Sequence, residues 1–140
     1  MLTQKIIVGV LALLLSACAG ASKSATDIEV KLTDFSYVPS SITVPVGQPV
    51  VLTINNTGRV EHDFVVEKID VTNVVAQDSG SEHHMQDMDA STYDLHVSTG
   101  PGQTNSLQFT ALEPGTYQIF CSVDGHIEAG MVGELIVASQ

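Results

Sequence analysis

The chain has 140 residues, which is the length of one ordinary domain, and 44% of them are hydrophobic, which is enough for a core. Sixteen acidic residues stand against five basic ones, so the formal net charge is −11. Such a charge repels nucleic acid and anionic membrane surfaces and favours cationic partners, although it also simply keeps a protein soluble. We therefore expect a single domain that acts as a monomer and binds no nucleic acid.

Residues 1–17 are typical of a bacterial export signal. Lys5 precedes an apolar run at residues 6–15, and small residues follow the run. The run is short for a permanent membrane span, which needs about 20 apolar residues. Leu-Ser-Ala-Cys at residues 15–18 also resembles the lipobox of bacterial lipoproteins, in which the cysteine is lipidated and becomes the mature N-terminus. We expect Cys18 to be lipidated, with an ordinary secretory signal as the alternative.

The residues that follow Cys18 predict a tether and then a folded domain. They are small and polar as far as residue 27, so we expect the lipidated cysteine and a flexible tether at residues 18–27 and the domain at residues 28–140. The protein would then be anchored to a bacterial membrane and face the periplasm or the exterior. With Cys18 acylated, Cys121 is the only thiol of the domain, and no internal disulfide can form. A lone thiol outside the cytoplasm is open to oxidation unless something such as a metal occupies it.

The domain is predicted to be built from short β-strands. Ile28, Val30 and Leu32 alternate with polar residues, which is the pattern of a strand with one buried face. Residues 35–39 form a connector that ends at a proline. Similar patterns predict further strands at residues 42–44, 50–54, 60–66, 106–110, 116–121 and 133–138. About seven short strands without a long amphipathic helix indicate an all-β sandwich.

The strand at residues 60–66 carries the first candidate ligand. His62 shares one face with Val60, Phe64 and Val66, so it is predicted to point into the core. A buried imidazole needs either a hydrogen-bond partner or a metal, and this strand alone does not decide between them. The opposite face is expected to be lined by carboxylates, namely Glu61, Asp63 and Glu67.

An irregular acidic insertion is expected around residues 69–102, with a short strand or turn at each end. It contains a possible secondary copper-binding cluster made of His83, His84, Met85 and Met88. The simpler interpretation is a solvated loop with incidental ligands, because the spacing follows no strict metal-binding pattern. His96 has no cysteine near it and is expected to be structural.

The densest group of soft ligands lies near the C-terminus. Cys121 shares a strand face with Tyr117 and Ile119, and His126 and Met131 follow it at intervals of five residues. Thiolate, imidazole and thioether suit copper better than magnesium or calcium, which prefer oxygen. Two imidazoles, one thiolate and a weak axial thioether describe a blue-copper electron-transfer site, if His62 joins the group.

With these candidate ligands, the domain resembles the cupredoxin family of type 1 blue copper proteins, which includes plastocyanin. The resemblance rests on Val-Glu-His-Asp-Phe around His62 after Asn-Thr-Gly, on Glu-Pro-Gly-Thr-Tyr before Phe-Cys121, and on Cys-Ser-Val-Asp-Gly-His-Ile-Glu-Ala-Gly-Met at residues 121–131. The loop spacing is most similar to the rusticyanin and sulfocyanin branch.

The resemblance implies an antiparallel Greek-key β-sandwich that binds one copper ion and carries single electrons by Cu(I)/Cu(II) cycling. It further implies that His62, Cys121 and His126 are the strong copper ligands and that Met131 is the weak axial one. The redox partner would be a protein such as a c-type cytochrome or an oxidase. In the family the loop histidine reaches the surface through an apolar docking patch, a role that Ile127, Ala129 and Val132 could fill here, although they could equally cap the sandwich.

One position departs from the family pattern. Cupredoxins commonly have Asn or Ser after the first histidine, where it bonds across to the cysteine loop, but this chain has Asp63. An ionised carboxylate accepts hydrogen bonds and cannot donate one to sulfur, so the reduction potential is left open.

Other functions compete with electron transfer. An exported protein with these ligands could bind or handle copper without a redox role, and the cluster at residues 83–88 would suit that function. Catalysis is not expected, because copper oxidases and nitrite reductases need further histidine clusters and domains. Zinc is a poorer candidate than copper, because thioether is a poor zinc ligand.

Overall fold

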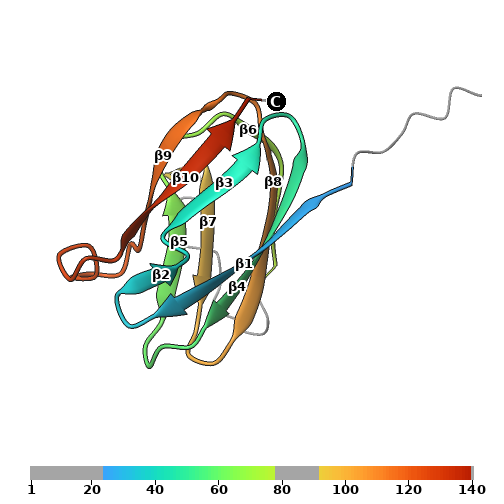
Figure 1. Cartoon of the computed structure of the whole chain (residues 1–140). Helices are drawn as coiled ribbons and strands as arrows, with labels where there is room; N and C mark the ends of the chain where they lie inside the picture. Colours follow the sequence, from blue (N-terminus) through green and yellow to red (C-terminus); the bar gives the residue numbers. More distant parts are fainter. Residues whose placement is uncertain (1–23, 78–91, 140) are drawn as a thin grey trace, which may run out of the picture.

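The computed structural model describes residues 24–77 and 92–139, and these residues form two five-stranded β-sheets packed face to face (Figure 1). The first sheet contains, in spatial order, β2 (Ser36–Val38), β1 (Thr26–Thr33), β4 (Pro49–Asn56), β8 (Thr104–Ala111) and β6 (Val71–Gln77). The second contains β3 (Ser41–Pro45), β10 (Val132–Ala138), β9 (Gly115–Phe120), β5 (His62–Val66) and β7 (Leu95–Thr99). Within the described ranges no helix is long and apolar enough to cross a membrane.

The predicted all-β sandwich is confirmed, but its sheets are mixed and not purely antiparallel. β1 pairs with β4 in parallel, and β10 pairs with β3 in parallel, while the other pairs are antiparallel. The chain leaves the first sheet after β2, passes through β3 in the second sheet and returns in β4, so β4 runs in the same direction as β1. Alternation of apolar residues shows which face of a strand is buried, but it does not give the direction of its neighbour.

More strands form than the sequence pattern indicated. The expected connector at residues 35–39 contains β2, which pairs with β1. Each end of the expected insertion at residues 69–102, predicted as a short strand or turn, is a strand, because β6 pairs with β8 and β7 pairs with β5. The middle of that insertion lies outside the described residues.

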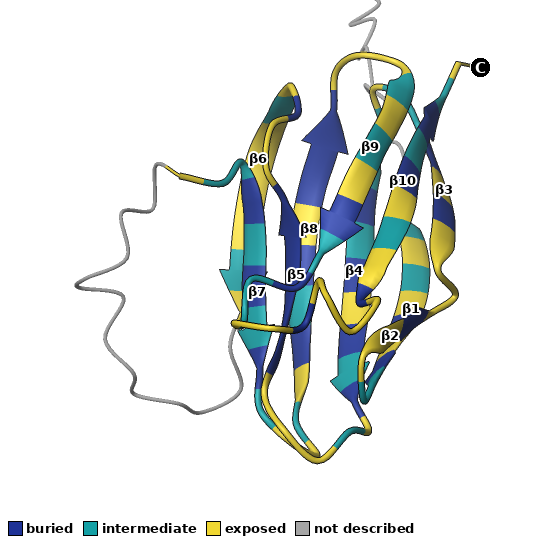
Figure 2. Ribbon diagram, turned by 90° about the vertical axis from the view of Figure 1, so that its left-hand side faces the viewer, coloured by how far each residue is buried: buried dark blue, intermediate teal, exposed yellow. Residues whose placement is uncertain are grey.

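The core lies between the sheets and follows the period-two pattern (Figure 2). Leu52 of β4 is paired with Leu107 of β8, and both are fully buried. The opposing sheet contributes residues such as Phe64 and Ile119, which are also fully buried. Burial of large aliphatic and aromatic side chains on both inner faces stabilises the sandwich by the hydrophobic effect.

β5 differs from the other strands because all five of its residues are buried. It lies between β9 and β7 in the second sheet. The face opposite the core, which was predicted to be lined by carboxylates, is therefore itself covered, because Asp63 is only 7% exposed and Val65 on the same face is fully buried. Only Glu61 and Glu67, just outside the strand, are exposed.

Candidate metal centre

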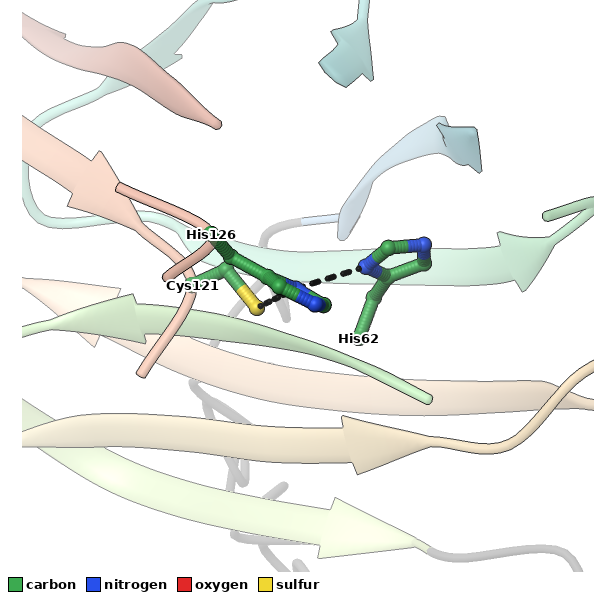
Figure 3. Close-up of side chains that lie close together, drawn as sticks. All are labelled: His62, Cys121 and His126. Carbon is green, nitrogen blue, oxygen red and sulfur yellow. Dashed lines mark hydrogen bonds between the residues drawn. The ribbon is translucent and has the colours of Figure 1, made fainter. Parts of the chain in front are cut away.

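Three side chains from two separate parts of the chain meet at one end of the sandwich (Figure 3). His62 is the first residue of β5, Cys121 directly follows β9, and His126 lies in the next turn. One ligand atom from each of them lies within 4.8 Å of the others. His62 Nδ1 is 3.2 Å from His126 Nδ1, and that atom is 3.2 Å from Cys121 Sγ. His62 and Cys121 are fully buried and His126 is 8% exposed, so the group is shielded from water.

Sheet register explains why His62 and Cys121 meet. β5 and β9 are antiparallel neighbours, and Val65 of β5 stands opposite Phe120 of β9. The start of β5 therefore lies beside the chain that leaves β9. The predicted inward orientation of His62 is confirmed by its complete burial, and so is that of Cys121.

Met131 is brought back to Cys121 by the hydrogen bonds of the intervening loop. The Cys121 N–H donates to the Met131 carbonyl at 3.3 Å, and the Met131 N–H donates to the His126 carbonyl at 2.9 Å. Gly125 and Gly130 have φ values of 80° and 98°, a left-handed region that favours glycine. Met131 is fully buried and belongs to the hydrophobic core beside Cys121.

Asp63 links the strand to the cysteine loop in spite of its charge. Its backbone N–H donates to Cys121 Sγ at 3.3 Å, and its carboxylate accepts a hydrogen bond from the Ser122 hydroxyl. His96 Nε2 lies 3.8 Å from the same carboxylate oxygen. The backbone of residue 63 thus supplies the hydrogen bond to sulfur that a carboxylate side chain cannot supply.

The charge of Asp63 is retained although the residue is buried. Burial acts to raise the pKa of this carboxyl, but contacts with His96 and Ser122 outweigh it and hold the pKa below its ordinary value. The carboxylate therefore stays ionised at neutral pH, beside the segment that contains the thiol.

Two of the three clustered side chains, His62 and Cys121, favour their neutral forms. Burial, assisted by the neighbouring His126, lowers the pKa of His62, and burial raises the pKa of Cys121. A neutral imidazole already has its lone pair free for a metal, whereas the thiol must lose a proton first. Metal binding at this site therefore releases a proton from Cys121.

Two neighbours of the site were not identified from the sequence. The ring of Phe35 stands edge-on to both imidazoles, with its centroid 5.1 Å from that of His126 and 6.3 Å from that of His62. Asp34 Oδ1 lies 3.8 Å from His62 Nε2. Both residues precede β2, far from the ligands in sequence, so no local pattern of residues could have indicated them.

The other predicted site residues lie at the surface, contact Asp63 or fall outside the described residues. Ile127, Ala129 and Val132 are exposed next to the buried His126, with Ile127 at 46% and Val132 at 38%. His96 contacts Asp63 and takes no place among the three clustered ligands, as expected for a structural residue. The lipidation residue and the proposed secondary cluster lie outside the described residues; these are Cys18, His83, His84, Met85 and Met88.

The chemistry of the donors tests whether a copper ion fits. The site offers one thiol sulfur and two imidazole nitrogens in a buried group, with a thioether in the adjoining core. Sulfur and imidazole donors suit copper. Calcium prefers oxygen ligands, and none of the three clustered side chains is a carboxylate. The residues present fit copper.

Comparison with known proteins agrees with this assignment. A family model for the cupredoxin-like domain matches residues 5–100, which include His62 but end before Cys121. The copper-resistant cuproprotein CopI of Rubrivivax gelatinosus is 32% identical over 118 residues, which are 84% of this chain and 69% of that protein.

Solved structures of auracyanins have the same fold. Reduced auracyanin from Roseiflexus castenholzii is 26% identical, with a TM-score of 0.61 over 83% of this chain and 98% of that one. Auracyanin A from Chloroflexus aurantiacus, a "blue" copper protein, is 22% identical, with a TM-score of 0.60 over 82% of this chain and 100% of that one.

A β-sandwich with two buried imidazoles and a buried thiol at one end defines a class of copper-binding proteins. The chain belongs to the cupredoxin family.

Proposed function

We propose that the protein is a mononuclear type 1 copper protein that carries single electrons. His62 Nδ1, Cys121 Sγ and His126 Nδ1 would be the strong ligands of one copper ion, and the Met131 thioether would be the weak axial ligand. The observation that supports this most directly is the convergence of three buried donor atoms within 4.8 Å, one of them a thiol that forms no disulfide within the described ranges.

The protein supports electron transfer by holding these donors in place. When bound, the copper supplies one-electron chemistry between Cu(I) and Cu(II). His62 is held by the sheet, and His126 and Met131 are held by loop hydrogen bonds to the end of β9. A buried donor set that keeps one geometry suits both oxidation states, which keeps the barrier to electron transfer low.

The surface suggests where a partner would bind. The buried His126 is followed in the chain by exposed Ile127, and the ring of exposed Phe35 contacts that of His126 edge-on. We propose that electrons pass at this end to a redox protein such as a c-type cytochrome or an oxidase, with the acidic surface favouring a basic partner. The protein would act as an exported monomer, held to a bacterial membrane through lipidated Cys18.

Adding Cu(II) to the purified metal-free protein tests the site. Binding of Cu(II) by thiolate should give an intense blue colour, and Cys121→Ser should abolish it by removing the sulfur donor. Cys18→Ser is the matched control and should keep the colour, because that cysteine is outside the proposed site. A colourless wild-type protein would refute the type 1 assignment.

A second function, copper handling in copper resistance, is favoured by the relationship to CopI, whose name describes a copper-resistant cuproprotein. The run His83-His84-Met85 and Met88 would then bind additional copper. Counting bound Cu(I) separates the two functions. A carrier should bind one equivalent, whereas a handling protein should bind more and should lose the excess when both His83 and His84 are replaced by alanine.

A further inference from the structure

The outer nitrogen of His62 is an unusual feature of the site. His62 Nδ1 faces the other two donors, so its Nε2 points away from them. This Nε2 is buried and has no hydrogen-bond partner within the described parts of the chain. A histidine that binds a metal through Nδ1 must carry its proton on Nε2, and a partner for that N–H normally fixes the tautomer and the orientation of the ring.

A carboxylate faces this nitrogen from a distant part of the chain. Asp34 directly follows β1 in the first sheet, whereas His62 begins β5 in the second. Asp34 Oδ1 lies 3.8 Å from His62 Nε2, which is slightly longer than a hydrogen bond. A small shift of either group would allow Nε2–H to donate to the carboxylate.

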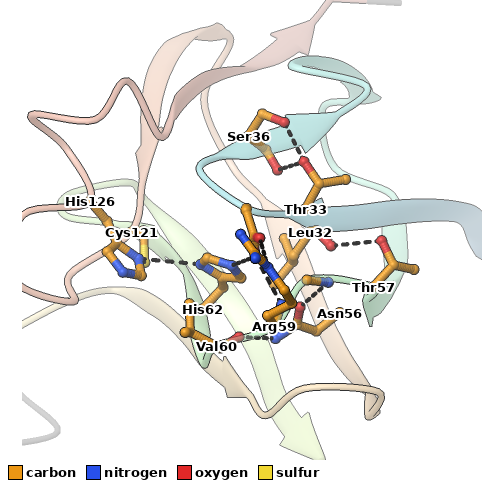
Figure 4. Close-up of polar contacts among 12 residues, drawn as sticks. Leu32, Thr33, Ser36, Asn56, Thr57, Arg59, Val60, His62, Cys121 and His126 are labelled. Atoms are coloured by element: carbon orange, nitrogen blue, oxygen red, sulfur yellow. Dashed lines mark hydrogen bonds and ion pairs between the residues drawn. The ribbon is translucent and has the colours of Figure 1, made fainter.

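Arg59 holds the carboxylate in this position. Its backbone N–H donates to Asp34 Oδ1 at 2.8 Å, and its side-chain Nε donates to Asp34 Oδ2 at 2.6 Å. Both oxygens of Asp34 are thus tied to a residue three positions before His62. Arg59 lies beside His62 in Figure 4. Because the arginine offsets the negative charge, Asp34 acts on His62 mainly through orientation and adds little net charge at the site.

Gly58 provides the space for this arrangement. A Cβ atom on residue 58 would lie 2.7 Å from Asp34 Oδ1 and 2.9 Å from His62 Nε2, both shorter than real Cβ contacts allow. The nearby Asn56 holds the loop, because its side-chain oxygen accepts the Gly58 N–H at 2.9 Å. A side chain at residue 58 would push the carboxylate and the imidazole apart.

We propose that Asp34 is a positioning residue for His62. Arg59 holds its carboxylate in place, and the absence of a side chain at Gly58 leaves room for the carboxylate to approach the imidazole. Asp34 keeps the proton of His62 on Nε2 and thereby presents Nδ1 to the copper. The role rests on the proposed copper site. The competing explanation is a purely structural ion pair that ties the turn after β1 to the loop before β5, with no effect on the imidazole.

Two variants and one control separate these explanations. Asp34→Ala removes the carboxylate, and Gly58→Ala keeps both charges but forces Asp34 away from His62. Asp94→Asn is the matched control, because Asp94 also accepts a backbone N–H, from Ile69, and also pairs with a cation, Lys68, without contacting the site. A positioning role predicts that Asp34→Ala and Gly58→Ala weaken copper affinity by about 10- to 100-fold. Asp94→Asn should keep the wild-type affinity.

The second readout needs no metal. Nitrogen NMR of the full metal-free protein, at a pH where His62 is neutral, reports which ring nitrogen carries the proton. The wild type should hold the Nε2–H tautomer, and both variants should show a mixture. Asp34→Asn should largely restore the tautomer, because its amide oxygen still accepts the hydrogen bond.

The tautomer and the copper affinity of the variants together decide whether Asp34 positions His62. Wild-type tautomer and wild-type copper affinity in Gly58→Ala or in folded Asp34→Ala would overturn the positioning role. If the wild-type protein bound no copper, the proposed function would fail, while the tautomer comparison would still test the link between Asp34 and His62. If Asp34→Ala did not fold, Gly58→Ala would give the same test, with Asp34→Asn as the variant that should keep the wild-type tautomer.

Discussion

The strand half and the loop half of the metal centre are held by different forces. The strand half, His62 and Asp63 on β5, lies between two neighbouring strands and is buried on both faces. The loop half, residues 122–130, lies outside the sheets and is largely exposed except at His126. It is held by a few of its own backbone hydrogen bonds. It follows that loss of apolar contacts should destabilise the protein more in the strand half than in the loop half.

Matched valine substitutions should give the largest contrast in stability between the halves. Val65 on β5 is fully buried, whereas Val123 in the loop is only partly buried against the core. Val65→Ala should lower the free energy of unfolding by about 2 kcal/mol, and Val123→Ala by less than about 1 kcal/mol. Chemical denaturation of the metal-free protein measures both. Equal losses would mean that the loop is as much a part of the core as the strand.

Asp63→Asn should raise the reduction potential of the copper-loaded protein. The buried carboxylate is ionised and lies beside Ser122, next to the thiolate ligand, so it should favour Cu(II) over Cu(I). Removing its charge should raise the potential by about 60 mV, a tenfold change in the redox equilibrium for one electron. Glu67→Gln is the control, because that carboxylate is exposed just beyond the other end of β5 and is screened by water. A potential that did not change in Asp63→Asn would show that the charge is compensated.

The pH dependence of stability should also report on the strand half. Since His62 has a lowered pKa in the folded protein, the unfolded chain binds more protons once the pH falls below the ordinary histidine value of 6.5. This contribution to stability is complete above pH 6.5 and is lost as the pH falls toward the pKa of the folded state. The slope from this one group cannot exceed about 1.4 kcal/mol per pH unit. Denaturation of the metal-free protein between pH 7 and pH 5 measures the loss, and His62→Gln should reduce it. An unchanged slope in that variant would assign the loss to other groups.

The smallest effect on the site itself is expected from the surface of the loop half. Ile127→Lys should slow electron transfer to a basic redox protein by about tenfold while the blue colour persists, because the new charge repels the partner at the docking surface. Val74→Lys adds the same charge at a similarly exposed valine on β6, in the other sheet, and should leave the rate almost unchanged. Stopped-flow mixing with a c-type cytochrome measures both rates. Equal rates for the two variants would place docking elsewhere.

Much of the metal centre could be predicted from the sequence because its ligands obey local rules. The alternation of side chains along a strand predicts that His62 and Cys121 point into the core, and both are fully buried in the folded protein. Glycines directly precede His126 and Met131 in the sequence, and both adopt positive φ in the folded protein. The copper ligation itself stays a prediction, as do lipidation at Cys18 and a second copper cluster at residues 83–88.

Only the tertiary structure decided the surroundings of those ligands. Strand alternation put Asp63 on the face opposite the core, but it could not show that Ser122 and His96 cover that face and bury the carboxylate. Asp34 and Phe35 lie in the turn between β1 and β2 of the first sheet and contact His62 at the start of β5 in the second sheet. The sequence by itself thus determined the donor atoms and the face from which they project. Pairing between distant strands decided which other side chains surround them, because such contacts depend on the whole chain and leave no periodic trace in any one segment.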